Sequence, residues 1–439
     1  MTESNRPTHP DRSRTINGGT VNHHRRTTRR LLASVTAASL LVVACSDDDD
    51  GGDTTAESAT STEGTTATTA TSGTTGTTGT TTGGTSATTT GGSGSAAPAN
   101  LADVCPDPFV IQTDWFPESE HGALYEMMGD DYEVDGNNKV VKGRLVAGGE
   151  DTGIGYEIRA GGPAIASTVA ATTYSDDSIT LAYANTESQV TQNGETPLVS
   201  ILAPLEINPQ IIYWDPETYP DVQTLADLGE EEITINIFSN SVYAEVFIAD
   251  GTWSEGQVDP SYDGSPARFV SEDGAIAQQG FASAEPYKYE EEFTDWGKPV
   301  EYELIHDAGF EVYSQTLAAR ADDVEGLSDC FAAFVPIAQQ AAIDYVDDPA
   351  RANAIIIDAV EGFDTFWTYD EGVAEFSVET QKELGLVGNG PDETLGNMDE
   401  ARIQDVIDQM RDAGVDGVPE DLEAADLFTN EFIDTSIGL

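Results

Sequence analysis

Segments with the pattern of β-strands alternate with segments with the pattern of α-helices from Cys105 to about Val415. The stretch "PFVIQTDW" has the apolar run of a buried strand. The stretch "EHGALYEMMG" that follows has the pattern of a short helix ending at Gly129. Further along, "TLADLG" and "ITINIF" again place a helix before a strand. This alternation predicts an α/β fold whose parallel or mixed sheets are flanked by helices.

Two long strand-like stretches, near 198–214 and 301–320, have the pattern of crossings between two folded lobes. We therefore predict a two-lobed fold with a double crossover hinge. Residues 105–205 and 305–415 would form the first lobe, and residues 206–304 the second. The acidic segment 416–439 has the pattern of an amphipathic helix that could dock on either lobe.

Residues 1–44 have the three parts of an export signal. A segment with four arginines precedes a short apolar run, 31–44, that ends in Val42-Val43-Ala44-Cys45. The run is too short to span a bilayer comfortably as a helix. Its end resembles a bacterial lipobox, which implies cleavage before Cys45 and a lipid on that residue. An ordinary signal or anchor with a chance cysteine is the alternative. The stretch "TRRLL" leaves open whether export follows the general or the twin-arginine route.

Residues 45–98 are almost entirely Thr, Gly, Ser, Ala, Asp and Glu. Such a composition cannot bury a core, so it predicts a disordered, extended tether. Signal and tether together predict an exported protein anchored by the lipid on Cys45 to the outer face of the cytoplasmic membrane.

The chain is strongly acidic, with 79 Asp and Glu against 19 Lys and Arg, a formal net charge of -60. A surface of this charge repels nucleic acid and anionic membranes, which argues against either as a partner of the folded part. If Cys45 carries a lipid, Cys105 and Cys330 remain. Because an exported protein reaches an oxidising environment, these two cysteines are expected to form a disulfide. Two free buried thiols are the alternative.

Polar and aromatic side chains follow four of the predicted strands, at the ends where α/β sheets bind ligands. The candidate ligand-binding residues are Asp114, Trp115, His121 and Tyr125 in the first group, Glu157 and Arg159 in the second, Ser239, Asn240 and Tyr243 in the third, and Glu285 and Tyr287 in the fourth. Aromatic walls with a few carboxylates and one Arg suit a flat polar heterocycle or a small zwitterion.

Each group also has a purely structural interpretation. The aromatic residues could belong to the core, and His121 could form a hydrogen bond at the N-terminus of a helix. Glu157 and Arg159 could form a surface pair, and Ser239 could cap a helix.

Enzyme motifs are absent from the sequence, which contains no GxSxG, HExxH, GxxxxGK[ST] or CxxC. Outside the N-terminal segment the histidines are His121 and His306. We therefore expect no metal site, no cofactor and no enzymatic activity.

The stretch "TDWFPESEHGALY" is similar to the D-W-x-P-N-x-x-H-x-G-x-Y pattern of the bacterial solute-binding proteins for thiamine-pyrimidine precursors, alkanesulfonates, taurine and nitrate. Glu118 replaces the Asn of that pattern, and Ala123 stands where the family has Gly. The matching positions are Asp114, Trp115, Pro117, His121 and Tyr125. "AQQGFASAEPY" and "EVYSQTLAARADDVE" resemble later segments of the family, so the resemblance covers most of 108–345.

The resemblance implies a monomeric protein with the type 2 periplasmic-binding-protein-like fold, which closes on a ligand and delivers it to an ABC permease. It implies ligand contacts by Trp115, His121, Tyr125 and Glu285. The first expected ligand is a pyrimidine-like thiamine precursor or related heterocycle, with a flavin as another option. The alternative is a sulfonate, taurine or nitrate, with Arg159 as its cationic partner. More remote alternatives are an adhesion protein and a cell-surface hydrolase that uses Glu157 and Glu285 as a carboxylate pair.

Overall fold

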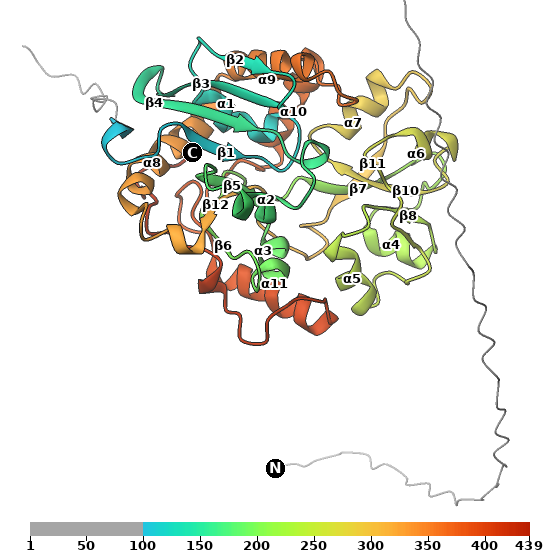
Figure 1. Ribbon diagram of the computed structural model, residues 1–439. Coiled ribbons are helices and arrows are strands. Elements are labelled where there is room, and N and C mark those ends of the chain that lie inside the picture. Colours follow the sequence, from blue (N-terminus) through green and yellow to red (C-terminus); the bar gives the residue numbers. More distant parts are fainter. Residues whose placement is uncertain (1–99) are drawn as a thin grey trace, which may run out of the picture. The chain divides into compact units, whose positions relative to one another are not determined.

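The computed structural model describes residues 100–439 (Figure 1). The predicted signal peptide 1–44, the predicted lipidation site Cys45 and the predicted tether 45–98 lie outside the described residues. Within residues 100–439, no helix combines the length and the apolar character needed to cross a membrane.

The larger of two sheets has seven strands in the order β2-β3-β4-β1-β5-β12-β6. β1 pairs in parallel with β4 and β5, and the other neighbours in this sheet are antiparallel. The strands are β1 Phe109–Gln112, β2 Glu133–Asp135, β3 Val140–Ala147, β4 Glu150–Arg159, β5 Leu181–Ala184, β6 Leu198–Leu202 and β12 Thr316–Arg320.

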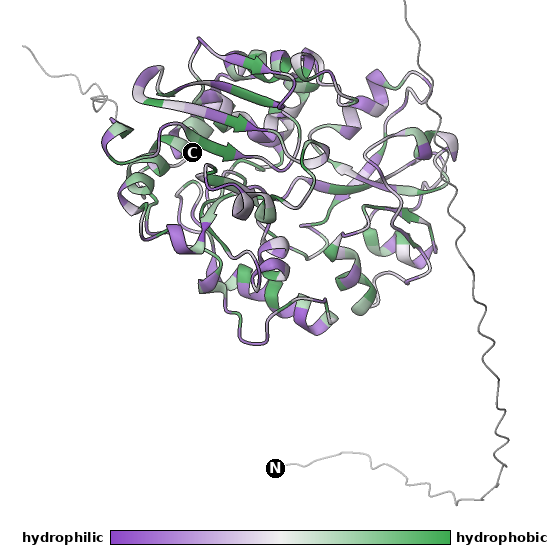
Figure 2. Cartoon of the chain, in the orientation of Figure 1, coloured by the Kyte–Doolittle hydropathy of each residue, from purple (hydrophilic) through white to green (hydrophobic). Residues whose placement is uncertain are grey.

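β1 is buried at every position because it lies in the middle of this sheet. Its sequence is a continuous apolar run, as expected for a parallel strand with both faces covered, and Figure 2 shows the strand as hydrophobic. The Phe109 ring stacks on Phe334 of the long helix α8 (Ser328–Asp347), with 4.5 Å between ring centroids. The core thus fixes β1, and the residues that follow it are held at the edge of the sheet.

The smaller sheet has five strands in the order β11-β7-β10-β8-β9. β10 is antiparallel to β7 and parallel to β8. The strands are β7 Gln210–Trp214, β8 Ile235–Asn236, β9 Val258–Asp259, β10 Ala277–Phe281 and β11 Glu301–Leu304.

The chain crosses between the sheets twice. It leaves the larger sheet after β6 and joins the smaller sheet at β7, and it returns between β11 and β12. The two crossings lie where the sequence predicted them, and the predicted α/β fold with two mixed sheets and a double crossing is confirmed.

Helices flank both sheets (Figure 1). Before the first crossing and after the second lie α1 Gly122–Glu126, α2 Val169–Ser175, α3 Thr186–Gln192, α8, α9 Ala350–Phe363, α10 Glu371–Glu383 and α11 Glu400–Ala413. Between the crossings lie α4 Leu225–Glu230, α5 Val242–Ala249, α6 Ala267–Ser271 and α7 Glu285–Tyr287. Short 3-10 helices are η1 Leu101–Asp103, η2 Ser119–His121, η3 Gly162–Ala164, η5 Ala321–Asp323 and η6 Ala424–Asp426, and η4 Lys288–Glu292 is a π-helix.

Helix α11 packs against α3 and α5, so it contacts both parts of the fold. Its apolar stripe includes Ile403, Ile407 and Met410, and these side chains share a core with Trp214 of the smaller sheet. A helical pattern shows which face is apolar but not which sheet will cover that face. The lobe boundaries 105–205, 206–304 and 305–415 therefore stay a proposal, with α11 bridging the two lobes.

A disulfide joins Cys105 and Cys330 across a sequence separation of 225 residues. Cys105 follows η1, just before β1, and Cys330 lies in the first turn of α8, where it is fully buried. The predicted disulfide is confirmed, and the alternative of two free thiols is wrong.

The structure corrects the helix that the sequence predicted at the C-terminal end. The segment 416–439 contains only η6 as a helix, because its apolar residues pack into two different cores instead of forming one apolar helix face. Leu422 and Leu427 share the core that contains Trp214, and Phe432 belongs to the core that contains Phe109 of β1. Elsewhere, α6 ends at Ser271, Gly274 adopts a φ of +69°, and the chain continues as β10.

Candidate ligand-binding cleft

A cleft between the two sheets is lined by residues from both parts of the fold. Two kinds of side chain dominate its lining: the aromatic residues Trp115, Phe238, Tyr262 and Trp367, and the carboxyl residues Asp114, Glu118, Glu120 and Glu285. Asp114 follows β1, Phe238 follows β8 and Glu285 follows β10. The strand ends of the two sheets therefore meet at this cleft, which is the place where α/β sheets bind ligands.

Aromatic side chains contact one another on each side of the cleft, and Trp115 and Phe238 contact each other across it. Ring centroids are 6.3 Å apart between Trp115 and Phe238, 6.0 Å between Trp115 and Trp367, and 4.7 Å between Phe238 and Tyr262. Trp115 and Trp367 come from the larger-sheet side, and Phe238 and Tyr262 from the smaller-sheet side. A flat ligand that entered here would find an aromatic face on each side.

The four carboxyl groups have few positive partners. Asp114 Oδ1 lies 3.1 Å from His121 Nε2, and Glu118 Oε1 lies 3.6 Å from the same nitrogen. Glu120 accepts a hydrogen bond from Ser283 Oγ, which comes from the other side of the cleft. Glu285 Oε2 accepts from the Phe281 backbone N–H at 2.6 Å. Among the described residues that line the cleft there is no Lys or Arg.

Burial weakens the acidity of three of these groups. It raises the pKa of Glu118 well above its ordinary value, and repulsion by Glu120 and Asp114 adds to the effect. Burial also raises the pKa of Glu120 and of Glu285, although the hydrogen bonds from Ser283 and from the Phe281 N–H oppose it. Holding these carboxylates ionised in an empty cleft thus costs free energy.

Gln315, from the second crossing, completes the polar lining. It is 1% exposed, and its Nε2 approaches Glu118 Oε1 at 3.3 Å and Asp114 Oδ1 at 3.4 Å. Its Oε1 is buried without a hydrogen-bond partner. The backbone of Gln315 has a φ of 53°, a left-handed conformation that is unfavourable for a residue with a side chain.

His121 and Tyr125, both expected to contact the ligand, lie behind the wall of the cleft. Both are buried in the core around β1, and neither lines the cleft. His121 reaches the cleft only through Asp114 and Glu118, the two carboxyl groups it approaches. His121 Nε2 lies 3.1 Å from Asp114 Oδ1, and Tyr125 packs in the core.

The third predicted group lies beside the cleft. Tyr243 is buried and donates a hydrogen bond from its hydroxyl to Gln279 Oε1 at 2.8 Å, and Gln279 does line the cleft. Ser239 and Asn240 are exposed. Asn240 lines a neighbouring cavity that also includes Asp114.

The second group and Tyr287 do not line the cleft. Arg159 forms ion pairs with Glu157 at 2.9 Å and with Asp176 at 3.0 Å. Residues 157 and 159 share one face of β4, so they pair with each other instead of converging with Glu285. The Tyr287 ring packs on Phe376 with centroids 5.5 Å apart.

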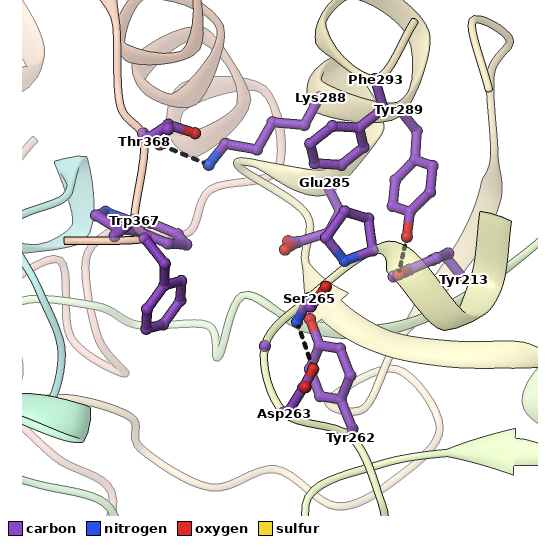
Figure 3. A pocket seen from close by; sticks show the side chains of 13 residues that line it. Tyr213, Tyr262, Asp263, Ser265, Glu285, Lys288, Tyr289, Phe293, Trp367 and Thr368 are labelled. Carbon is purple, nitrogen blue, oxygen red and sulfur yellow. Dashed lines mark hydrogen bonds between the residues drawn. The ribbon is translucent and has the colours of Figure 1, made fainter. Parts of the chain in front are cut away.

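A second cavity adjoins the cleft and shares Tyr262, Glu285 and Trp367 with it (Figure 3). Lys288 reaches into it, with Nζ 4.0 Å from the Trp367 ring centroid and donating to the Thr368 carbonyl at 2.8 Å. Burial lowers the pKa of this ammonium group, and the charge of Glu285 opposes the shift. Lys288 on the smaller-sheet side therefore contacts the 364–370 loop on the larger-sheet side.

Sequence reasoning missed several residues of the lining. Phe238, Tyr262 and Trp367 lie in loops without a recognisable motif, and Gln315 is one polar residue in a strand-like stretch. The only available signal was the concentration of aromatic residues in "FDTFWTYD", residues 363–370.

Two sheets joined by a double crossing, with the cleft at their strand ends, match the architecture that the sequence resemblance implied. The chain has an α/β fold of two mixed sheets that are joined by a double crossing. No family model and no curated protein sequence matches it. The assignment rests on the strand order and the two crossings.

Solved structures that are similar to the chain include a ligand-binding component of an ABC-type import system from Staphylococcus aureus with zinc bound. It has a TM-score of 0.47 and 10% identity, over 74% of this chain and 97% of that one. An alkanesulfonate-binding protein from Xanthomonas axonopodis pv. citri, bound to MOPS, has a TM-score of 0.46 and 13% identity, over 76% and 99%. A Candida albicans protein described as having the generic periplasmic binding protein fold has a TM-score of 0.44 and 13% identity, over 75% and 98%.

Replacing Glu118 with Gln should stabilise the empty protein at neutral pH. The raised pKa means that the folded state of the wild type binds the Glu118 proton more tightly than the unfolded state does. Wild-type stability therefore falls as pH rises above the ordinary pKa of a glutamate, whereas the Gln variant does not titrate here. The difference in melting temperature should be largest at neutral pH and disappear in acid. A variant that is less stable than the wild type at neutral pH would contradict this prediction.

Proposed function

We propose that this protein is the extracytoplasmic substrate-binding component of an ABC importer and that it captures a small polar heterocycle. One observation carries the proposal: a single cleft is lined by aromatic and carboxyl side chains from both sheets, and the chain crosses between those sheets only twice within the described residues. Two parts joined at two crossings can open and close around a bound molecule.

The aromatic lining supports a flat ligand. Trp115 and Trp367 on one side and Phe238 and Tyr262 on the other offer ring faces, and carboxyl groups among them offer hydrogen-bond acceptors. A pyrimidine-like thiamine precursor or a related heterocycle has these features. The motif that runs through Asp114 and Trp115 supports the same ligand class.

The alternatives receive less support from the cleft. An anion would need a positive partner, but Arg159 is paired with Glu157 and Asp176 outside the cleft. A hydrolase built on Glu157 and Glu285 would need both carboxyl groups at one site, and only Glu285 lines the cleft.

Delivery to a permease requires that the protein be held at the membrane surface. The sequence of 1–98, with its export signal, Cys45 and low-complexity segment, supports anchoring by a lipid on the outer face of the cytoplasmic membrane. We propose that the folded part acts as a monomer on this tether and docks on an ABC permease.

A thermal-shift screen of the full chain, purified in mild detergent, tests the proposal. The panel contains aminopyrimidines, flavins, alkanesulfonates, taurine and nitrate. A ligand that binds the folded state raises the melting temperature by mass action. We expect heterocycles to raise it in the wild type and in Arg159→Ala. A response to sulfonates or nitrate that is lost in Arg159→Ala would favour the anion alternative, and no response to any compound would contradict the proposed function.

A further inference from the structure

We infer that the cleft selects a positively charged ligand that donates N–H hydrogen bonds, such as a protonated amino-substituted heterocycle. This inference rests on the proposed function and narrows the ligand class. Three observations on the lining carry it: its charge, its hydrogen-bonding character and its aromatic faces.

The ionisable side chains of the lining are all acidic. Asp114, Glu118, Glu120 and Glu285 line one cleft without a Lys or Arg among its described lining residues. The nearest ammonium group, Lys288, belongs to the adjoining cavity and is already hydrogen-bonded to the Thr368 carbonyl. Like charges that are brought together away from water repel one another. A cation in the cleft would relieve this repulsion, whereas an anion would increase it.

The hydrogen-bonding atoms at the centre of the lining are mostly acceptors. Gln315 Oε1 is a buried carbonyl oxygen with no partner, and Gln315 Nε2 is already directed at the carboxyl oxygens of Asp114 and Glu118. A buried acceptor without a donor is costly, so a ligand N–H group that reached Gln315 Oε1 would be favourable. Carboxylates beside it also need donors, and a ligand with several N–H groups would satisfy both.

The aromatic rings favour an organic cation. The faces of Trp115, Phe238, Tyr262 and Trp367 attract positive charge through their ring quadrupoles. In residues 100–439, no group of three or more His, Cys, Asp and Glu side chains has an arrangement that could hold a metal ion. An organic nitrogen cation therefore fits this cleft better than a bare metal ion.

Four small probes separate the effect of ligand charge on affinity from the effect of ligand hydrogen-bond donors. 4-Aminopyridine is protonated at neutral pH and donates N–H bonds, and aniline has nearly the same shape but is neutral. 1-Methylpyridinium is a cation without N–H donors, and benzoate is an anion. Calorimetric titration of the full chain in detergent should give roughly tenfold tighter binding of 4-aminopyridine than of aniline. We expect 1-methylpyridinium to lie between them and benzoate not to bind.

Three variants assign the effect to the cleft. Glu285→Gln should weaken binding of 4-aminopyridine roughly fivefold and leave aniline unchanged, because it removes charge at nearly constant shape. Gln315→Met should weaken both N–H donors but not 1-methylpyridinium. Asp176→Asn is the matched control, because this carboxylate pairs with Arg159 outside the cleft, and we expect it to bind like the wild type. A cooperative melting transition at or above the melting temperature of the wild type establishes that each variant is folded.

The outcomes separate this inference from the proposed function. Equal binding of aniline and 4-aminopyridine, or no effect of Glu285→Gln, would overturn the charge inference and leave the proposed heterocycle site in place. Tighter binding of benzoate would overturn the inference and favour an anion. Absence of binding by all four probes to folded protein would contradict the proposed function itself.

Discussion

Replacing both Cys105 and Cys330 with Ala should lower the free energy of unfolding by about 5 kcal/mol. The disulfide closes a loop with a sequence separation of 225 residues, and in the chain-entropy model a longer loop restricts the unfolded chain more strongly. The bond ties the segment before β1 to the first turn of α8, whose side chains pack on β1 through Phe334. Thermal unfolding of the double variant and the wild type measures the effect.

Reduction of the disulfide in the wild type provides the control for this prediction. Reduced wild type should unfold at nearly the same temperature as the double variant, and reduction should leave the double variant unchanged. An equal midpoint for the oxidised wild type and the double variant would show that the bond adds no stability.

Trp115→Ala should weaken ligand binding roughly 30-fold, which corresponds to about 2 kcal/mol. Trp115 contacts Phe238 from the other side of the cleft as well as Trp367, so its removal takes away one aromatic wall and loosens two others. The measurement is the dissociation constant of whichever compound gives the largest thermal shift. An unchanged dissociation constant would show that Trp115 does not contribute to ligand binding.

A glycine substitution tests the position of Trp115 without removing the ring. A Cβ atom on Gly162 would lie 2.3 Å from the Trp115 ring, so Gly162→Ala must displace it. Gly162 and Gly148 both have a φ of +54°, but nothing lies within 4 Å of a Cβ on Gly148. Gly148→Ala therefore carries the same backbone strain without the contact. We expect Gly162→Ala to weaken binding and Gly148→Ala to leave the affinity unchanged.

The fold was largely predictable because its signals are local. The apolar run of β1 and the rhythm of strands and helices gave the fold class, and two long strand-like stretches gave the crossings. The segment 416–439 was not predictable in the same way. Its apolar residues have a helical spacing, but Leu422 and Leu427 pack in the core around Trp214 and Phe432 packs in the core around β1, and a local pattern does not encode these tertiary contacts.

The cleft was predictable only where a residue follows a strand. Asp114, Trp115 and Glu285 do so, and they line the cleft. Arg159 also ends a strand, but its pairing with Asp176 depends on where the chain turns after α2, which the sequence pattern does not show. Gln315 and Trp367 come from a crossing and a loop, and their convergence on the cleft is a product of tertiary structure.

The disulfide also determines what holds the molecule together if the backbone is cut. Cys105 precedes the first crossing and Cys330 follows the second, so all five strands of the smaller sheet lie inside a covalent ring. A single cleavage by a protease at either crossing would open that ring without releasing a fragment. The two halves would stay linked through sulfur, and reduction as well as proteolysis would be needed to separate them.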